Sequence, residues 1–292
     1  MDTLAEIWFG RSSFAEFMAG RLPLGHGGYL CNPMRALISF ITRFVPRHLL
    51  QRFAHLALQM VSPFYRGQKF EDPINGRMYR KLLSYGRADR SRPNALAPDT
   101  LSLERHRAVW IYLTEYSNLM DGGPNRKMLH LAPEYCFLKR FNRAEGLEIT
   151  RADLVSPWAD VHFDVHDIPY ADNHFDIIMG NHLMEHVEDD RKVMGEYFRV
   201  MKPGGWGIFQ VPLDRSLSET LEDPNVTDPA ERERLYWQRD HVRLYGMDYA
   251  DRYRAAGFEV EELDLRELYG PERFERCALG SERYLHVVRK PS

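Results

Sequence analysis

The stretch FDIIMGNHLMEHVEDDRKVMGEYFRVMKPGGWGIFQV (175–211) decides the fold. Its opening apolar run, Phe175–Met179, predicts a buried strand. Apolar residues at helical spacing follow over Asp189–Val200, and Lys202-Pro-Gly-Gly205 ends that helix. Trp206–Val211 is a second apolar run and predicts a second strand. A strand, a helix and a strand in this order predict a βαβ unit with parallel strands.

The same alternation extends from Pro124 to the end of the chain. It predicts an α/β fold with a doubly wound sheet of seven strands. The last two strands have no long helix between them, so we expect them to form an antiparallel hairpin at one edge. Besides the two strands above, the predicted strands are Lys127–Leu131, Leu147–Ala152, Val161–Phe163, Phe258–Leu265 and Tyr284–Arg289, and the other predicted helices are Glu134–Asn142 and Met247–Ala256.

Composition sets broad limits on the 292 residues. A net charge of −3 argues against a dedicated nucleic-acid binder. Residues 1–120 carry an excess of basic side chains and the rest an excess of acidic ones, which suggests two units of different character. Three cysteines far apart, an acidic start and the lack of a long apolar run predict a cytoplasmic protein that is not an integral membrane protein.

The first part of the chain divides into two regions, 1–63 and 64–120. Apolar residues at helical spacing between Pro33 and Pro63 predict a mainly helical lid or homodimer contact; a basic helix pair on a membrane surface is the alternative. Residues 64–120 predict short strands followed by a helix over 101–120. The loop Asp121-Gly-Gly-Pro124 marks the start of the third region, 121–292.

Two tetrapeptides in 64–120 have the spacing of the paired knuckles of a zinc ribbon. They are Asp72-Pro-Ile-Asn75 and Ala97-Pro-Asp-Thr100, and neither contains cysteine. Because these side chains cannot close a tetrahedral thiolate site, we expect no zinc. Either the segment keeps the shape of a ribbon without its metal, or the spacing is chance.

Polar residues follow the predicted strands, at the edge where open α/β sheets bind ligands. The first strand ends in His130-Leu-Ala-Pro-Glu134, the second is followed by Asp153-Leu154, the third by Asp164-Val165, and the fourth by Asn181-His182. Each of these residues is a candidate ligand contact, and Asp153 has the alternative of an N-cap or loop residue.

Three motifs in order resemble the class I S-adenosylmethionine-dependent methyltransferases, over about 125–290. They are Asp164–Asp176, Asn181–Val187 and Val200–Trp206. His130–Glu134 at the first turn, preceded by Ser-Leu-Glu-Arg-His-Arg (102–107), resembles a bacterial subgroup in which some members carry an upstream zinc ribbon. The resemblance implies a Rossmann-like sheet of seven strands with a reversed last strand.

The resemblance also implies S-adenosylmethionine as cofactor. It places Asp153 at the ribose, Asp164 and Val165 at the adenine, and Glu134 at the ammonium of the methionine end. The implied cofactor-binding residues are His130, Ala132, Pro133, Glu134, Asp153, Leu154, Asp164, Val165, Asn181 and His182. This chain departs from the family pattern at the first turn, where Ala132, Glu134 and Cys136 stand in place of glycines.

Candidate bases for removing a proton from an acceptor are His182, His186 and His241, because the pKa of histidine lies near neutrality. Asp240 or another carboxylate is expected to orient His241; a loop salt-bridge cluster is the alternative. The charged insert 214–240 is expected to shape the acceptor pocket, and its carboxylates suit Mg²⁺ beside a sugar diol, with a solvated loop as the alternative.

These observations predict O-methylation of a hydroxyl on a small metabolite or saccharide. N- or C-methylation of a small molecule and a catalytically inactive binding module are the alternatives.

Overall fold

The computed structural model describes residues 58–86, 91–117, 119–120, 125–280 and 282–292. The predicted lid over 1–63 lies almost entirely outside the described residues. Contacts divide the chain into two units, Met1–Leu103 and Glu104–Ser292, so the division falls before the loop at 121 that the sequence suggests.

The first unit contains two small antiparallel sheets. A short helical turn, η2 (Ser62–Tyr65), precedes β1 (Arg66–Asp72), which pairs with β2 (Arg77–Tyr79). The second sheet pairs β3 (Leu83–Tyr85) with β4 (Arg92–Leu96).

The two tetrapeptides with ribbon spacing meet in this unit. Asp72 is fully buried, and its carboxylate accepts hydrogen bonds from the hydroxyls of Thr100 and Ser102. Asp99 accepts hydrogen bonds from Arg77 at 2.9 Å and from the hydroxyl of Tyr79 at 2.6 Å. Side-chain hydrogen bonds therefore join the two turns, and a ribbon ancestry stays a prediction.

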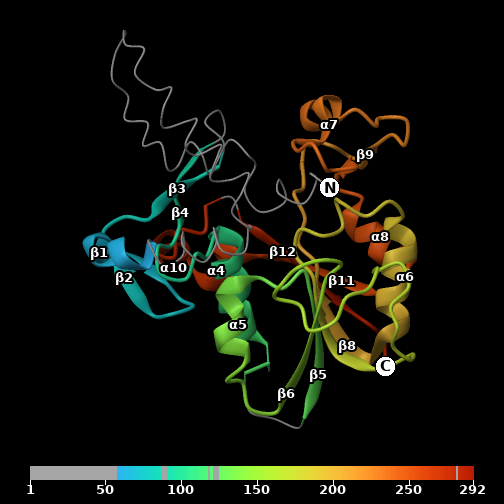
Figure 1. Ribbon diagram of the computed structural model, residues 1–292, viewed down its shortest axis with the longest axis horizontal. Coiled ribbons are helices and arrows are strands. Elements are labelled where there is room, and N and C mark those ends of the chain that lie inside the picture. Colours follow the sequence, from blue (N-terminus) through green and yellow to red (C-terminus); the bar gives the residue numbers. More distant parts are fainter. Residues whose placement is uncertain (1–57, 87–90, 118, 121–124, 281) are drawn as a thin grey trace. The chain divides into compact units, whose positions relative to one another are not determined.

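The second unit is built on one six-stranded sheet with the order β11-β12-β8-β7-β5-β6. In the N-terminal half of the unit, α4 continues into the π-helical turn η3. Helix α5 connects β5 to β6, and α6 connects β7 to β8 (Figure 1). These elements are α4 (Glu104–Ile111), η3 (Tyr112–Tyr116), β5 (Arg126–Leu131), α5 (Tyr135–Phe141), β6 (Leu147–Ala152), β7 (Phe175–Met179), α6 (Asp190–Val200) and β8 (Met201–Ile208).

The C-terminal half completes the sheet with β11 and β12 and carries the insert. Its elements are β9 (Leu221–Glu222), α7 (Pro229–Tyr236), β10 (Arg243–Leu244), α8 (Tyr249–Ala255), β11 (Glu259–Asp264), α9 (Leu265–Tyr269), α10 (Pro271–Arg276) and β12 (Tyr284–Arg289).

Strand directions confirm the predicted reversal at the end of the chain. β5 pairs in parallel with β6 and β7, and β7 pairs in parallel with β8. β12 is antiparallel to both of its neighbours, β8 and β11. Between β7 and β8 the register shifts, so that Lys202–Gly205 forms an irregularity inside β8 instead of lying before it.

The prediction of seven strands is wrong by one for the described residues. The expected strand Val161–Phe163 is reduced to a single parallel bridge between Ala152 and Val161. A turn follows at once, in which the N–H of Asp167 donates to the carbonyl of Asp164. The polar turn ends the pairing before a strand forms.

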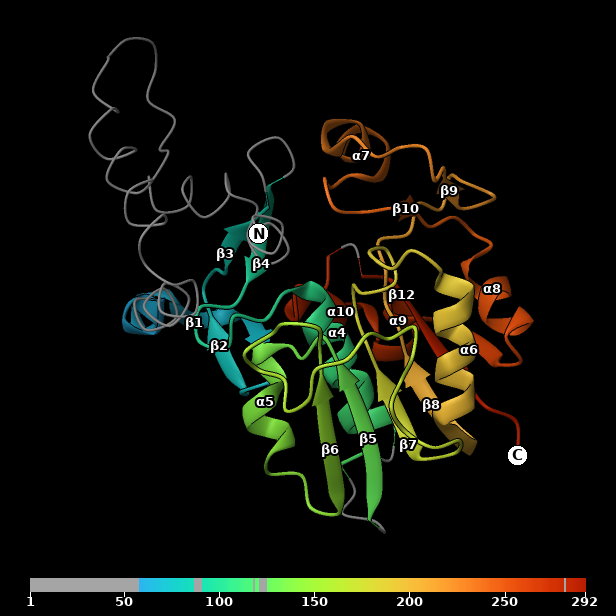
Figure 2. The same ribbon diagram turned by 45° about the vertical axis from the view of Figure 1, so that its right-hand side comes forward.

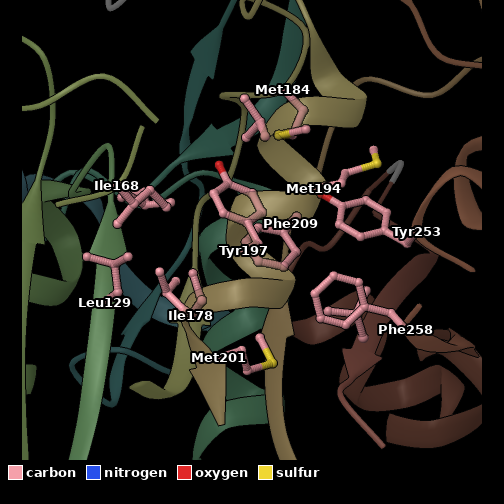
Figure 3. Close-up of a cluster of buried hydrophobic side chains, with 14 of the residues drawn as sticks. Leu129, Ile168, Ile178, Met184, Met194, Tyr197, Met201, Phe209, Tyr253 and Phe258 are labelled. Carbon is pink, nitrogen blue, oxygen red and sulfur yellow. The ribbon is translucent and has the colours of Figure 1, made fainter. Parts of the chain in front are cut away.

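Helices cover both faces of the sheet, as Figures 1 and 2 show. Side chains along β5 alternate between the faces, so Leu129 and Leu131 join the core under α6 and α8, whereas the ring of His130 meets Phe141 of α5. On the α6 side, Phe209 stacks between Tyr197 and Tyr253 at ring distances of 4.6 and 5.4 Å (Figure 3).

Within the part of the chain that the structure describes, no helix is both long and apolar enough to cross a lipid bilayer.

Candidate active site

The turn after β5 brings three predicted cofactor-binding residues together. His130 Nε2 lies 2.9 Å from Glu134 Oε2, and the Asn181 amide donates to Glu134 Oε1 at 2.9 Å. All three side chains are buried. Both oxygens of Glu134 therefore have partners inside the protein.

The backbone of this turn has the conformation that a glycine would favour. Ala132 has a φ of 45°, in the left-handed region, and its N–H donates to the carbonyl of Ala152 on β6. Pro133 follows it and is buried. Alanine thus holds a backbone conformation that favours glycine, at a cost in backbone strain of about 1–2 kcal/mol.

Asp153 follows the end of β6 directly. Its Oδ1 accepts hydrogen bonds from the backbone N–H groups of Val155 and Ser156, both at 2.8 Å. The next two residues, Leu154 and Val155, expose 63% and 54% of their surface. The carboxylate is held in place by the backbone beside an exposed apolar pair.

Asp164 lies after the single bridge that replaces the third strand. Its Oδ1 accepts from both the backbone N–H and the ring Nδ1 of His166, at 2.9 and 2.6 Å. These hydrogen bonds hold the pKa of the carboxyl below its usual value, against a smaller opposing effect of burial. Val165 packs against the core, which fixes the backbone of the turn.

The turn after β7 is tied to the end of β8. Asn181 Oδ1 accepts from the N–H of Gln210 at 3.2 Å, and the N–H of His182 donates to the carbonyl of Gln210. His182 has a φ of 52°, which is rare for a residue other than glycine. Strained backbone of this kind is concentrated at functional sites.

The structure brings all three candidate bases to one place, around Glu185. His182 Nδ1 lies 3.0 Å from Glu185 Oε1, and the rings of His186 and His241 are 4.8 Å apart. Glu185 and His241 are each 1% exposed, whereas His182 is partly exposed.

Burial and the neighbouring charges have opposite effects on the pKa values of Glu185 and His241. Burial alone would raise the pKa of Glu185, but the hydrogen bond and charge of His182, together with His186 and His241, lower it to about 2. Burial lowers the pKa of His241, against the raising effect of Glu185. At neutral pH the cluster therefore pairs an ionised Glu185 with a neutral His241.

The orienting group of His241 differs from the one that the sequence suggests. Its Nδ1 lies 2.8 Å from the carbonyl oxygen of Tyr236, at the end of α7. Asp240 instead contacts His186, whose Nδ1 lies 3.4 Å from Asp240 Oδ2. Sequence reasoning also missed Glu185 as the residue at the centre, although it lies between two of the predicted histidines.

Acidic residues of the insert 214–240 have local partners. Glu222 pairs with Arg243 and Arg252 at 2.8 Å each, and Asp228 caps α7 by accepting from the N–H of Glu231. These contacts position the insert, and a Mg²⁺ site on it stays a prediction.

Residues 130–209 match the family model of the methyltransferase domain. The match runs from the last two residues of β5 to the end of β8. It supports the resemblance to class I S-adenosylmethionine-dependent methyltransferases, and the order and directions of the strands agree with that fold. Membership of the bacterial subgroup stays a prediction.

One curated relative is the glycine/sarcosine/dimethylglycine N-methyltransferase of Actinopolyspora halophila. It is 29% identical over 150 residues, which are 51% of this chain and 23% of the relative. The chain therefore spans about a quarter of the length of the relative that it matches.

Solved structures with a related arrangement have low identity to the chain. A chain of the complex between the Trm112 methyltransferase activator of Haloferax volcanii and a methyltransferase has a TM-score of 0.41 and 18% identity, covering 65% of this chain and 94% of that one. The Haemonchus contortus phosphoethanolamine N-methyltransferase 2 has a TM-score of 0.41 and 14% identity, covering 64% and 53%. Likeness at this level does not specify a reaction or an acceptor.

Proposed function

We propose that this protein is an S-adenosylmethionine-dependent methyltransferase that methylates a hydroxyl group on a small metabolite or saccharide. The observation that carries the proposal is the methyltransferase-domain match over 130–209. Within it, Asp153 follows β6, and Asp164 follows the single bridge that Val161 forms beside β6. Ligands of open α/β sheets bind at this edge, where the strand order reverses.

The residues at the strand ends fit the proposed cofactor. Asp153 would accept hydrogen bonds from the ribose, because two backbone N–H groups already fix its carboxylate beside the exposed Leu154. Asp164 would meet the adenine amino group, and Glu134 with Asn181 would face the methionine end. When bound, this cofactor supplies a methyl group that is already activated on a sulfonium.

The protein would then have to position the acceptor and take its proton. His182 is the best placed of the three histidines, since its side chain is 26% exposed against 19% for His186, and His241 is buried. Its Nδ1 also lies 3.0 Å from a carboxylate oxygen of Glu185. An ionised Glu185 accepts only, so Nδ1 of His182 is the donor in this contact, and Nε2 would be the atom that faces the acceptor. Proton removal by such a base typically contributes about 10²–10⁴-fold in rate.

N-methylation is the second candidate, and the relative from Actinopolyspora halophila favours it. An amine that arrives as an ammonium ion must also lose a proton before it can attack, so His182 would serve the same role. The two candidates differ in acceptor and not in the placement of the cofactor.

Binding of S-adenosylhomocysteine tests the cofactor site by calorimetry. We expect binding by the wild type and a loss of about ten-fold or more in Asp153→Ala, because a hydrogen bond to a charged group contributes about 1.5–3 kcal/mol. Asp172→Ala is the matched control, since Asp172 is exposed and pairs with Arg199. A folded wild type that does not bind at high micromolar concentration would refute the proposal and favour an inactive module.

Transfer of a labelled methyl group tests the acceptor. A panel of sugars and phenols is compared with glycine and sarcosine, and product is counted for each. We expect His182→Ala to lower kcat far more than it weakens the binding of S-adenosylhomocysteine. Labelling confined to the amines would replace the hydroxyl acceptor with the second candidate.

A further inference from the structure

Three side chains of types that can bind a metal gather at the turn between β7 and α6. Glu185 and His186 come from that turn, and His241 comes from the segment that follows α7. One ligating atom from each of the three lies within 4.8 Å of the other two. Imidazole and carboxylate ligands keep about 2.0–2.2 Å from a transition metal, so the three atoms would have to move closer together around an ion.

Two of these side chains have a buried atom with no hydrogen-bond partner among the described residues. They are Oε2 of Glu185 and Nε2 of His241, and each residue is 1% exposed. The other oxygen of Glu185 is engaged by His182. A buried polar atom without a partner costs about 1–3 kcal/mol, and more when it is charged, so such atoms need an explanation. A cation between them would satisfy both.

The surroundings orient the two imidazoles as metal sites do. A carbonyl oxygen only accepts, so the contact of His241 Nδ1 with Tyr236 places the proton on Nδ1 and leaves the lone pair on Nε2. The Nδ1 of His186 faces the carbonyl and the carboxylate of Asp240, at 3.3 and 3.4 Å. Metal-binding histidines usually donate their second N–H to a carbonyl or carboxylate in this way.

We propose that Glu185, His186 and His241 bind one divalent transition-metal ion. Two imidazoles and one carboxylate favour Zn²⁺, Co²⁺, Fe²⁺ or Mn²⁺ over Mg²⁺ or Ca²⁺, which prefer oxygen ligands. Three protein ligands leave a coordination position for water or for an oxygen of the acceptor. The role beside the acceptor rests on the proposed methyltransferase function, in which the metal would lower the pKa of the hydroxyl to be methylated.

Cobalt is the probe that tests the site. Full-length, tag-free protein is stripped with a chelator and titrated with Co²⁺, followed by calorimetry and visible absorption. We expect one equivalent, displaced by Zn²⁺, and a loss of affinity of about 100-fold or more in Glu185→Gln and in His241→Ala. His286→Ala is the matched control, because His286 and Glu262 form a histidine–carboxylate pair at 3.1 Å elsewhere on the sheet.

Binding of S-adenosylhomocysteine by the same samples separates this inference from the proposed function. Samples that bind the nucleoside but take up no stoichiometric Co²⁺ overturn the metal site alone. Samples that bind Co²⁺ but not the nucleoside overturn the methyltransferase proposal alone. Circular dichroism checks folding, and the near-isosteric Glu185→Gln decides the outcome if His241→Ala unfolds. Equal Co²⁺ affinity in Glu185→Gln and the wild type would overturn the site.

Discussion

Asp190 is a buried carboxylate whose removal should strongly destabilise the second unit. Its Oδ2 accepts from Arg252 at 2.9 Å and from the hydroxyl of Tyr245 at 3.0 Å. The side chains of Asp190 and Arg252 are 5% and 6% exposed. Removing one partner of a buried ion pair costs about 3–5 kcal/mol. Arg252 keeps Glu222 and Asp248 as partners, so we expect Asp190→Ala to lose about 3 kcal/mol, at the lower end of that range.

An exposed pair on α8 gives the matched control. Asp251 and Arg254 pair at 2.7 Å, but their side chains are 73% and 51% exposed, so Asp251→Ala should change the free energy of unfolding by less than about 1 kcal/mol. For a unit of this size, 1 kcal/mol shifts Tm by about 2–4 °C, which predicts a loss of about 6–12 °C for Asp190→Ala. Urea unfolding and thermal melts by circular dichroism measure both variants. Similar losses in the two variants would refute the argument from burial.

Three further substitutions test local features. Ala132→Val should destabilise by about 1–2 kcal/mol in urea unfolding, because a β-branched residue tolerates a φ of 45° less well than alanine. Tyr197→Phe should raise Tm slightly or leave it unchanged, since the hydroxyl is buried and has no partner among the described residues. Hydrogen bonds from Arg199 lower the pKa of Glu196, so the stability lost in Glu196→Gln should be largest above the ordinary glutamate pKa of 4.5 and vanish as the pH falls through the lower folded value, as pH-dependent melts would show.

Strong local patterns made most of the sheet predictable. β7 and β12 have the predicted bounds, because each is an apolar run between polar turns. The prediction of a strand over Val161–Phe163 was wrong, because three residues carry too little pattern to distinguish a strand from a single bridge. The Lys202–Gly205 segment was expected to lie outside the strand, but pairing with β7 absorbs it as an irregularity.

The histidines of the candidate site were predictable from the sequence, but Glu185 at its centre and the contacts between these residues were not. The histidines 182, 186 and 241 stand out by type and position, yet more than fifty residues separate the last from the others. No local pattern shows that His241 would return to the turn after β7, or that a main-chain carbonyl would orient it. Such contacts depend on the tertiary course of the insert, which charge and turn composition alone do not specify.

The segment 241–243 explains why the turn after β7 holds its shape. Each of its residues contacts that turn: His241 faces His186, the N–H of Val242 donates to the carbonyl of Glu185, and Arg243 donates to the carbonyls of Met184, Val187 and Glu188. Arg243 is almost fully buried, so these charge-assisted hydrogen bonds are strong. The segment therefore brings His241 to the turn and fixes the backbone that carries Glu185 and His186. Because Glu222 joins Arg243 to Arg252, the charges of the insert help to position this segment.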